Sequence, residues 1–162
     1  LIIIKTRYFM SYQNALTITR QNRKALRKLM GFYTIEQLNK IPVGFNNNII
    51  WNCGHILSVQ QMLTNGLANV PFGISNELVN QYAPGTKPIQ TADAERVEDI
   101  KTMLIYTLEQ LEHDIAEHKF DQMSPFMTAL KFEINDLDSA VTFNQYHEAL
   151  HMGHMLNISK FL

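Results

Sequence analysis

The stretch YHEALHMGH (residues 146–154) carries three of the six histidines of this chain and decides how its last helix must pack. At about 100° per residue, a helix through this stretch places apolar side chains and histidines on the same side. The members of that stripe are Ala140, Phe143, His147, Leu150, His154, Ile158 and Phe161, with His151 directly beside it. Buried imidazoles need partners for their ring nitrogens, and one metal ion serves several rings at once. The sequence therefore predicts an inward-facing helix that takes part in a metal site.

Geometry limits how many of these histidines can bind one ion. A ligating nitrogen lies ~2.0–2.1 Å from a zinc-type ion, whereas His147 and His154 start ~10 Å apart along the helix axis. His147 and His151 are one turn apart and can share an ion. We therefore expect His154 to lie near the ion without binding it. The third ligand must come from another helix. His55 is the candidate, because it lies on the interior stripe of an earlier helical stretch, one turn after Trp51.

Three more long stretches show hydrophobic residues at helical spacing, and no convincing run of strands is found. The expected spans of the four long helices are residues 8–30, residues 49 to about 66, residues 91 to about 115 with Thr91 as the cap, and residues 136 or 138 to 162. Four long helices with one long connection between the second and the third predict an all-α four-helix bundle.

Turn and cap residues define the shorter segments. Thr34 and Gln37 have the spacing of a capping box, which predicts a short helix over residues 34–40. Residues 65–90 are rich in glycine and proline, as expected of a long connection, with a short helix at residues 75–81. A connection of this length often covers a site, so a pocket is expected beneath it at one end of the bundle.

The first long stretch divides into an apolar side and a basic side. The apolar side consists of Ala15, Ile18, Ala25, Leu26 and Leu29. The basic side consists of Arg20, Arg23, Lys24, Arg27 and Lys28. Because the formal net charge of the chain is -1, this cluster indicates a solvated helix face, and no nucleic-acid partner is expected.

Composition is typical of a globular protein. With 162 residues, 46% hydrophobic and 18% charged, the chain suits one domain over residues 1–162. Cys53 is the only cysteine, so no intramolecular disulfide can form; this favours a reducing compartment such as the cytoplasm, with Cys53 as a small buried hydrophobe. Residues 1–4 are apolar but fall far short of the ~20 residues that span a bilayer, so no membrane partner is expected.

Two separated motifs match a known family. The segment NIIWNCGHIL (residues 48–57), followed about ninety residues later by YHEALHMG (residues 146–153), resembles the DinB-like (YfiT-like) family. The resemblance implies a four-helix bundle with a divalent ion, often nickel or zinc, held by three histidines that match His55, His147 and His151. It also implies frequent homodimers, a small-molecule substrate, and either metal-dependent transfer with low-molecular-weight thiols or hydrolysis.

Other interpretations of the same residues remain open. The string from His147 to His151 satisfies His-Glu-x-x-His, in which Glu148 would be the general base of a metalloprotease, but the longer metzincin pattern fails. Glu148 is otherwise a partner close to the ligands or a side chain that points out of the bundle. A metal that only stabilises a non-catalytic binding module is the remaining alternative. His113 and His118 lie among charged residues and are expected at the surface.

Overall fold

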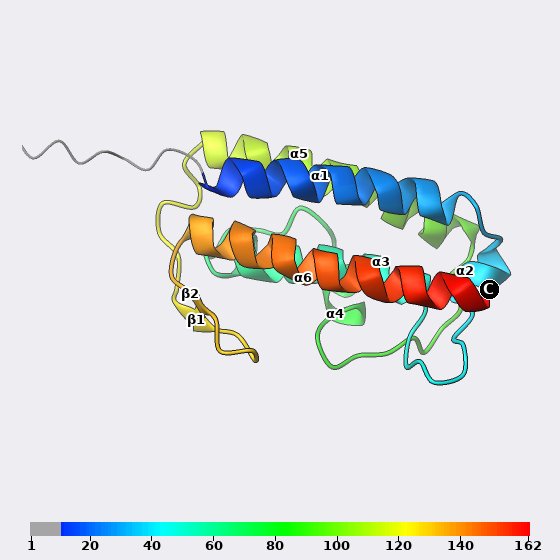
Figure 1. Cartoon of the computed structure of the whole chain (residues 1–162). Coiled ribbons are helices and arrows are strands. Elements are labelled where there is room, and N and C mark those ends of the chain that lie inside the picture. Colours follow the sequence, from blue (N-terminus) through cyan, green and yellow to red (C-terminus); the bar gives the residue numbers. More distant parts are fainter. Residues whose placement is uncertain (1–10) are drawn as a thin grey trace, which may run out of the picture.

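The computed structural model describes residues 11–162 as the predicted all-α four-helix bundle (Figure 1). The long helices are α1 (Ser11–Met30), α3 (Ile49–Gln61), α5 (Ala94–Ala116) and α6 (Leu137–Ile158). Helix α1 packs against α5 and α6, and α3 packs against the same two helices. The expected start of the first helix at residue 8 lies outside the described residues. Within residues 11–162, no helix combines the length and apolar character needed to cross a bilayer.

The long connection determines the directions of the helices. In Figure 1, α1 and α6 run in one direction and α3 and α5 run in the other. Two consecutive long helices can run in the same direction only if the chain between them returns along the bundle. Residues 67–93 provide this return, and they include the predicted short helix, α4 (Asn76–Gln81), which packs on α3.

Most helix starts are capped by the expected residues. Thr34 and Gln37 form the capping box of α2 (Ile35–Asn39), the side chain of Asn48 accepts a hydrogen bond from the Trp51 amide, and Asp136 caps α6. The prediction that Thr91 caps α5 is wrong, because Asp93 is the N-cap and its side chain accepts a hydrogen bond from the Arg96 amide. A carboxylate at this position also interacts favourably with the positive end of the helix, which a threonine hydroxyl does not.

Three segments add detail that the periodicity does not show. Helix α3 continues into a π-turn, η1 (Met62–Gly66), which ends at the expected glycine, and α6 ends in a 3₁₀ turn, η2 (Ser159–Phe161). Between α5 and α6 the chain forms a small antiparallel hairpin from β1 (Phe126–Met127) and β2 (Glu133–Ile134).

The inward side of α1 differs from the predicted one. The inward row is Ala15, Leu16, Thr19, Arg23, Leu26 and Met30. Ile18 is 45% exposed, and Arg23, expected on the solvated basic face, is 0% exposed. The prediction for Arg23 is wrong because its guanidinium finds hydrogen-bond acceptors on the other three long helices, which makes its burial tolerable.

Helix α6 is rotated relative to the predicted stripe by about one residue. Leu150 and Phe161, expected inside, are 50% and 56% exposed. The buried row is Ala140, Val141, Asn144, Glu148, Met155 and Ile158. This rotation places Glu148 in the core and His147, His151 and His154 at its half-buried edge. Helix α3, by contrast, is buried along its whole length, since α4 and the connection cover its outer side, and Cys53 lies in the core as expected.

Candidate metal centre

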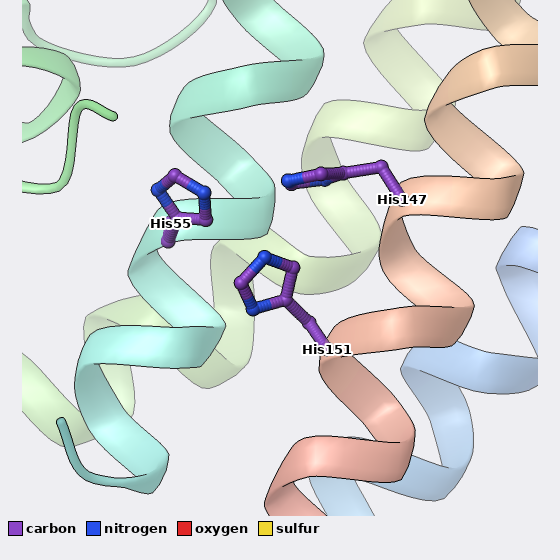
Figure 2. Close-up of side chains that lie close together, drawn as sticks. All are labelled: His55, His147 and His151. Carbon is purple, nitrogen blue, oxygen red and sulfur yellow. The ribbon is translucent and has the colours of Figure 1, made fainter. Parts of the chain in front are cut away.

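The fold brings His55, His147 and His151 together between α3 and α6 (Figure 2). One ring nitrogen from each residue lies within 4.8 Å of the others, a spacing that can hold a metal ion. The ring centroids are 4.5 Å apart for His147 and His151, 4.7 Å for His55 and His151, and 5.1 Å for His55 and His147. The i,i+4 pair on one helix and the single histidine on another are therefore near neighbours, as the spacing predicts.

His55 is held in one tautomer by the long connection. Its Nδ1 lies 2.7 Å from the main-chain oxygen of Tyr82, and because a carbonyl only accepts, Nδ1 must donate its proton. The lone pair of Nε2 is then free for another partner. The indole of Trp51 stacks on this ring with centroids 4.6 Å apart and an angle of 12° between the planes. His55 is thus fixed in orientation as well as in protonation.

His151 is held in the same way by an asparagine. Its Nδ1 lies 2.7 Å from Oδ1 of Asn52. The Asn52 amide can only be oriented in this sense, because its Nδ2 donates to Oδ1 of Asn47 at 2.9 Å and to the main-chain oxygen of Asn48 at 2.7 Å. Nδ1 of His151 therefore donates, and its Nε2 is free, as in His55.

His147 lacks such a partner. Its Nδ1 is buried and has no hydrogen-bond partner among the described residues. A buried polar atom without a partner costs free energy, and native proteins rarely leave one unless a bound group completes the site. The ring of Phe143 lies nearly parallel to it, at 6.4 Å and 25°. The donor set thus fits a metal ion, since imidazole nitrogens suit zinc and nickel.

Burial keeps the three rings neutral. It lowers the pKa of His55, and it lowers the pKa of His147 from 6.5 to about 4 and that of His151 to about 3, with the neighbouring rings adding to both shifts. Metal binding requires neutral imidazole, so these residues need not lose a proton to bind an ion near pH 7. Three histidines also leave coordination positions open for a substrate.

The fourth histidine of this region lies outside the group. Nε2 of His154 is 3.1 Å from Oδ1 of Asn47, and its ring packs against Phe45 at a centroid distance of 5.3 Å. Its ring nitrogens are not within reach of the other three. Its place fits the prediction that His154 is a neighbour.

A second group of potential ligands is already satisfied by a lysine. His113, Asp114 and Glu117 have spacing that could hold an ion. Nζ of Lys119, however, lies 2.7 Å from Asp114 and 2.8 Å from Glu117, so an ammonium group balances both carboxylates. His113 is exposed, as is His118, in agreement with their expected place at the surface.

Glu148 is turned away from the three histidines. Its carboxylate is 0% exposed and accepts from Arg23 on both oxygens, Nε to Oε2 at 3.0 Å and Nη2 to Oε1 at 2.6 Å. Nδ2 of Asn144 donates to Oε1 at 2.7 Å. The interpretation that Glu148 points out of the bundle is wrong. A carboxylate that is closed to water and bonded to a guanidinium is also unsuited to the role of a general base.

A cavity lies beside Trp51, the residue whose ring stacks on His55. It has a volume of about 750 Å³ and is lined by Trp51, Tyr82, residues 87–93 and the first turn of α5. Residues of the connection form one wall, as expected. The three histidines do not line it, because Trp51, which stacks on His55, forms the wall of the cavity on that side.

The residues that orient His55 and His151 were not predicted from the sequence. Asn52 could have been noticed, since it is a polar residue in an apolar run and lies three positions before His55, on the same side of the helix. Tyr82 acts through its main-chain oxygen, which leaves no signature in the sequence.

A helical bundle with three neutral histidines on two neighbouring antiparallel helices is the architecture of a metal-binding bundle protein. The sequence model of the DinB superfamily matches residues 18–155, most of the chain. The protein belongs to this superfamily, which confirms the family resemblance seen in the two motifs. No curated protein matches it.

Proposed function

We propose that this protein is a metal-dependent enzyme that transfers or hydrolyses a small molecule. One divalent ion, nickel or zinc, would be held by a ring nitrogen each of His55, His147 and His151. The observation that carries the proposal is the state of these rings: they are neutral, and His55 and His151 each donate Nδ1–H to an oxygen and keep Nε2 free. When bound, such an ion supplies Lewis acidity, which stabilises a thiolate or hydroxide and polarises an electrophile.

The remaining residues favour a low-molecular-weight thiol as the cosubstrate over a nucleophile from the protein. Cys53 is the only cysteine, it is completely buried, and burial raises its pKa to about 12. Its sulfur contacts the sulfur atoms of Met30 and Met155 at 3.7 and 3.6 Å and not the histidines. A reactive thiol must therefore come from a second molecule.

Three further features belong to the same proposal. The family resemblance supports a homodimer, the single cysteine supports the cytoplasm, and the composition supports one domain over residues 1–162. The non-catalytic alternative, in which the ion only joins α3 to α6, rests on the position of the histidines between these helices. A zincin-like protease has little support, since Glu148 is bound by Arg23.

The test is metal analysis followed by an activity screen, on protein purified without a histidine tag. We expect about one divalent ion per chain by elemental analysis, with anomalous scattering at the three histidines. The double variant His55→Ala, His147→Ala should lose the ion, whereas His113→Ala and His118→Ala, the matched controls, should keep it. Full occupancy in the double variant would contradict the proposed ligands.

The screen then separates the reactions. Metal-loaded protein is incubated with several biological thiols and an electrophile, and separately with ester, amide and peptide substrates. Thiol consumption that disappears in His151→Ala supports transfer, and ester or amide cleavage lost in the same variant supports hydrolysis. If no assay detects activity and chelation lowers the melting temperature strongly, the result supports the alternative in which the ion only stabilises the bundle.

A further inference from the structure

The guanidinium of Arg23 is buried in the centre of the bundle, and all its N–H groups are bonded. Nε and Nη2 donate to Glu148, Nη1 donates to Oγ1 of Thr107 at 2.7 Å and to the main-chain oxygen of Leu104 at 3.2 Å, and Nη2 also donates to Oε1 of Gln60 at 2.9 Å. An arginine has five such N–H groups, so none is left without a partner.

Two of these acceptor residues, Gln60 and Glu148, lie on the two helices that carry the three histidines. Gln60 is five residues after His55 on α3, and Glu148 directly follows His147 on α6. A single nitrogen, Nη2 of Arg23, bonds to both helices. Any rotation of α6 that moved His147 and His151 away from His55 would also withdraw Glu148 from this nitrogen.

We propose that Arg23 and Glu148 are positioning residues for the metal centre: they set the rotation of α6 so that His147 and His151 face His55. The inference rests on the proposed function, since it concerns the same three ligands. The apolar side chains of α6 are not confined to its buried face, since Tyr146, Leu150 and Leu156 are exposed. Other rotations of α6 would therefore bury comparable side chains, and apolar burial alone does not select one of them.

Stability alone does not account for this pair. Replacing a buried ion pair by apolar residues of similar volume is often neutral or stabilising, whereas a buried charge without its partner is strongly destabilising. A double apolar substitution therefore separates the two roles. If the pair only stabilised the bundle, its joint removal would leave the metal site intact.

The experiment compares the double variant Arg23→Met, Glu148→Leu with the wild type and with a matched surface control. The control is Arg20→Met, Glu112→Leu, which removes an ion pair of 2.7 Å between α1 and α5 at the surface. The probe is Co²⁺, whose visible absorption spectrum reports the number and arrangement of its ligands. We expect the buried double variant to bind Co²⁺ ~10-fold or more weakly with an altered spectrum, and the control to match the wild type.

A second measurement needs no metal. In the metal-free wild type, the Nδ1 proton of His151 is held by Asn52 and should give a slowly exchanging NMR signal. This signal should be lost in the buried double variant if α6 has rotated, while far-ultraviolet circular dichroism shows that the helices are retained. A wild type that keeps this signal but binds no ion would contradict the proposed function and leave the positioning role to be judged by NMR.

Should the double variant fail to fold, Glu148→Gln decides the question, since it keeps the volume of the side chain and removes its charge. Its Co²⁺ affinity should fall ~10-fold. Arg23→Lys should behave in the same way, because a compact ammonium with three N–H groups cannot make the five hydrogen bonds of the guanidinium. Wild-type affinity and spectrum in any folded variant of the pair, with the Nδ1 signal of His151 retained, would overturn the proposal.

Discussion

Gly54 lies directly against the ring of Tyr82, so closely that a Cβ atom on Gly54 would stand 2.5 Å from the ring carbon Cγ. Tyr82 is at the end of α4, and its main-chain oxygen accepts a hydrogen bond from Nδ1 of His55. The absence of a side chain at position 54 therefore allows the long connection to approach α3 and to hold the ring of His55.

We predict that Gly54→Ala weakens the metal site. The methyl group must displace the ring of Tyr82, which should cost about 1–3 kcal/mol of unfolding free energy and lengthen the bond to Nδ1 of His55. Chemical denaturation and metal titration measure the two effects. The matched control is Gly153→Ala on α6, where an added Cβ meets nothing within 4 Å and helix propensity should stabilise by about 0.5–1 kcal/mol. Equal behaviour of the two variants would refute this account of Gly54.

We predict that a paramagnetic ion quenches the fluorescence of the protein. Trp51 is the only tryptophan, and its ring stacks on His55, so an ion bound to His55 is within a few ångströms of the indole. Titration with Ni²⁺ or Co²⁺ should reduce the emission in a saturable manner, whereas Zn²⁺ should not. His151→Ala should shift the midpoint to higher metal concentration. Unchanged emission at full occupancy would show that the ion binds elsewhere.

We predict that the metal-free protein loses stability as the pH falls below 6.5. The native pKa values of His147 and His151, about 4 and about 3, are lower than the ordinary value. Between these values and 6.5 the unfolded chain binds more protons than the native protein, so the free energy of unfolding increases with pH in this window and levels off above it. Urea unfolding at several pH values measures the slope. The variant His147→Gln, His151→Gln should show a smaller slope, and identical slopes would contradict the assignment.

We predict that Cys53 does not react in the native protein. Burial raises the pKa of its thiol to about 12, so at pH 8 almost no thiolate is present and no reagent has access to it. A disulfide reagent that absorbs on reaction should label less than about a tenth of the chains at pH 8, and all of them in denaturant. Rapid, complete labelling without denaturant would instead place Cys53 among the candidate nucleophiles.

The helices could be predicted because their apolar residues repeat at helical spacing. The grouping of His55, His147 and His151 could be predicted because histidine is rare in this chain and two histidines one turn apart lie on the same side of a helix. The rotation of α6 about its axis could not be predicted in this way. A pattern of apolar and polar residues places Leu150 inside and Glu148 outside, and the opposite holds because Glu148 finds Arg23 on α1. Which buried charges will meet is a tertiary property that one helix does not contain.

The hydrogen-bond partner of His55 could not be predicted from the sequence either. The bond to His55 comes from the main chain of Tyr82, whose position depends on the course of residues 67–93. Glycine and proline mark this segment as a connection but do not fix its path. Asn52 could be predicted from the sequence, because its amide lies in an otherwise apolar run. The lining of the cavity beside Trp51 depends on the path of the connection, which the sequence does not fix.

The central guanidinium also determines how the bundle can fold. Arg23 finds its acceptors on α3, α5 and α6, and its counter-charge only on α6, the last helix of the chain. A half-formed bundle of α1, α3 and α5 would enclose a positive charge without its carboxylate, at a cost of several kcal/mol. Partly assembled states are therefore penalised, and the chain should fold as one cooperative unit once its C-terminal helix has been synthesised.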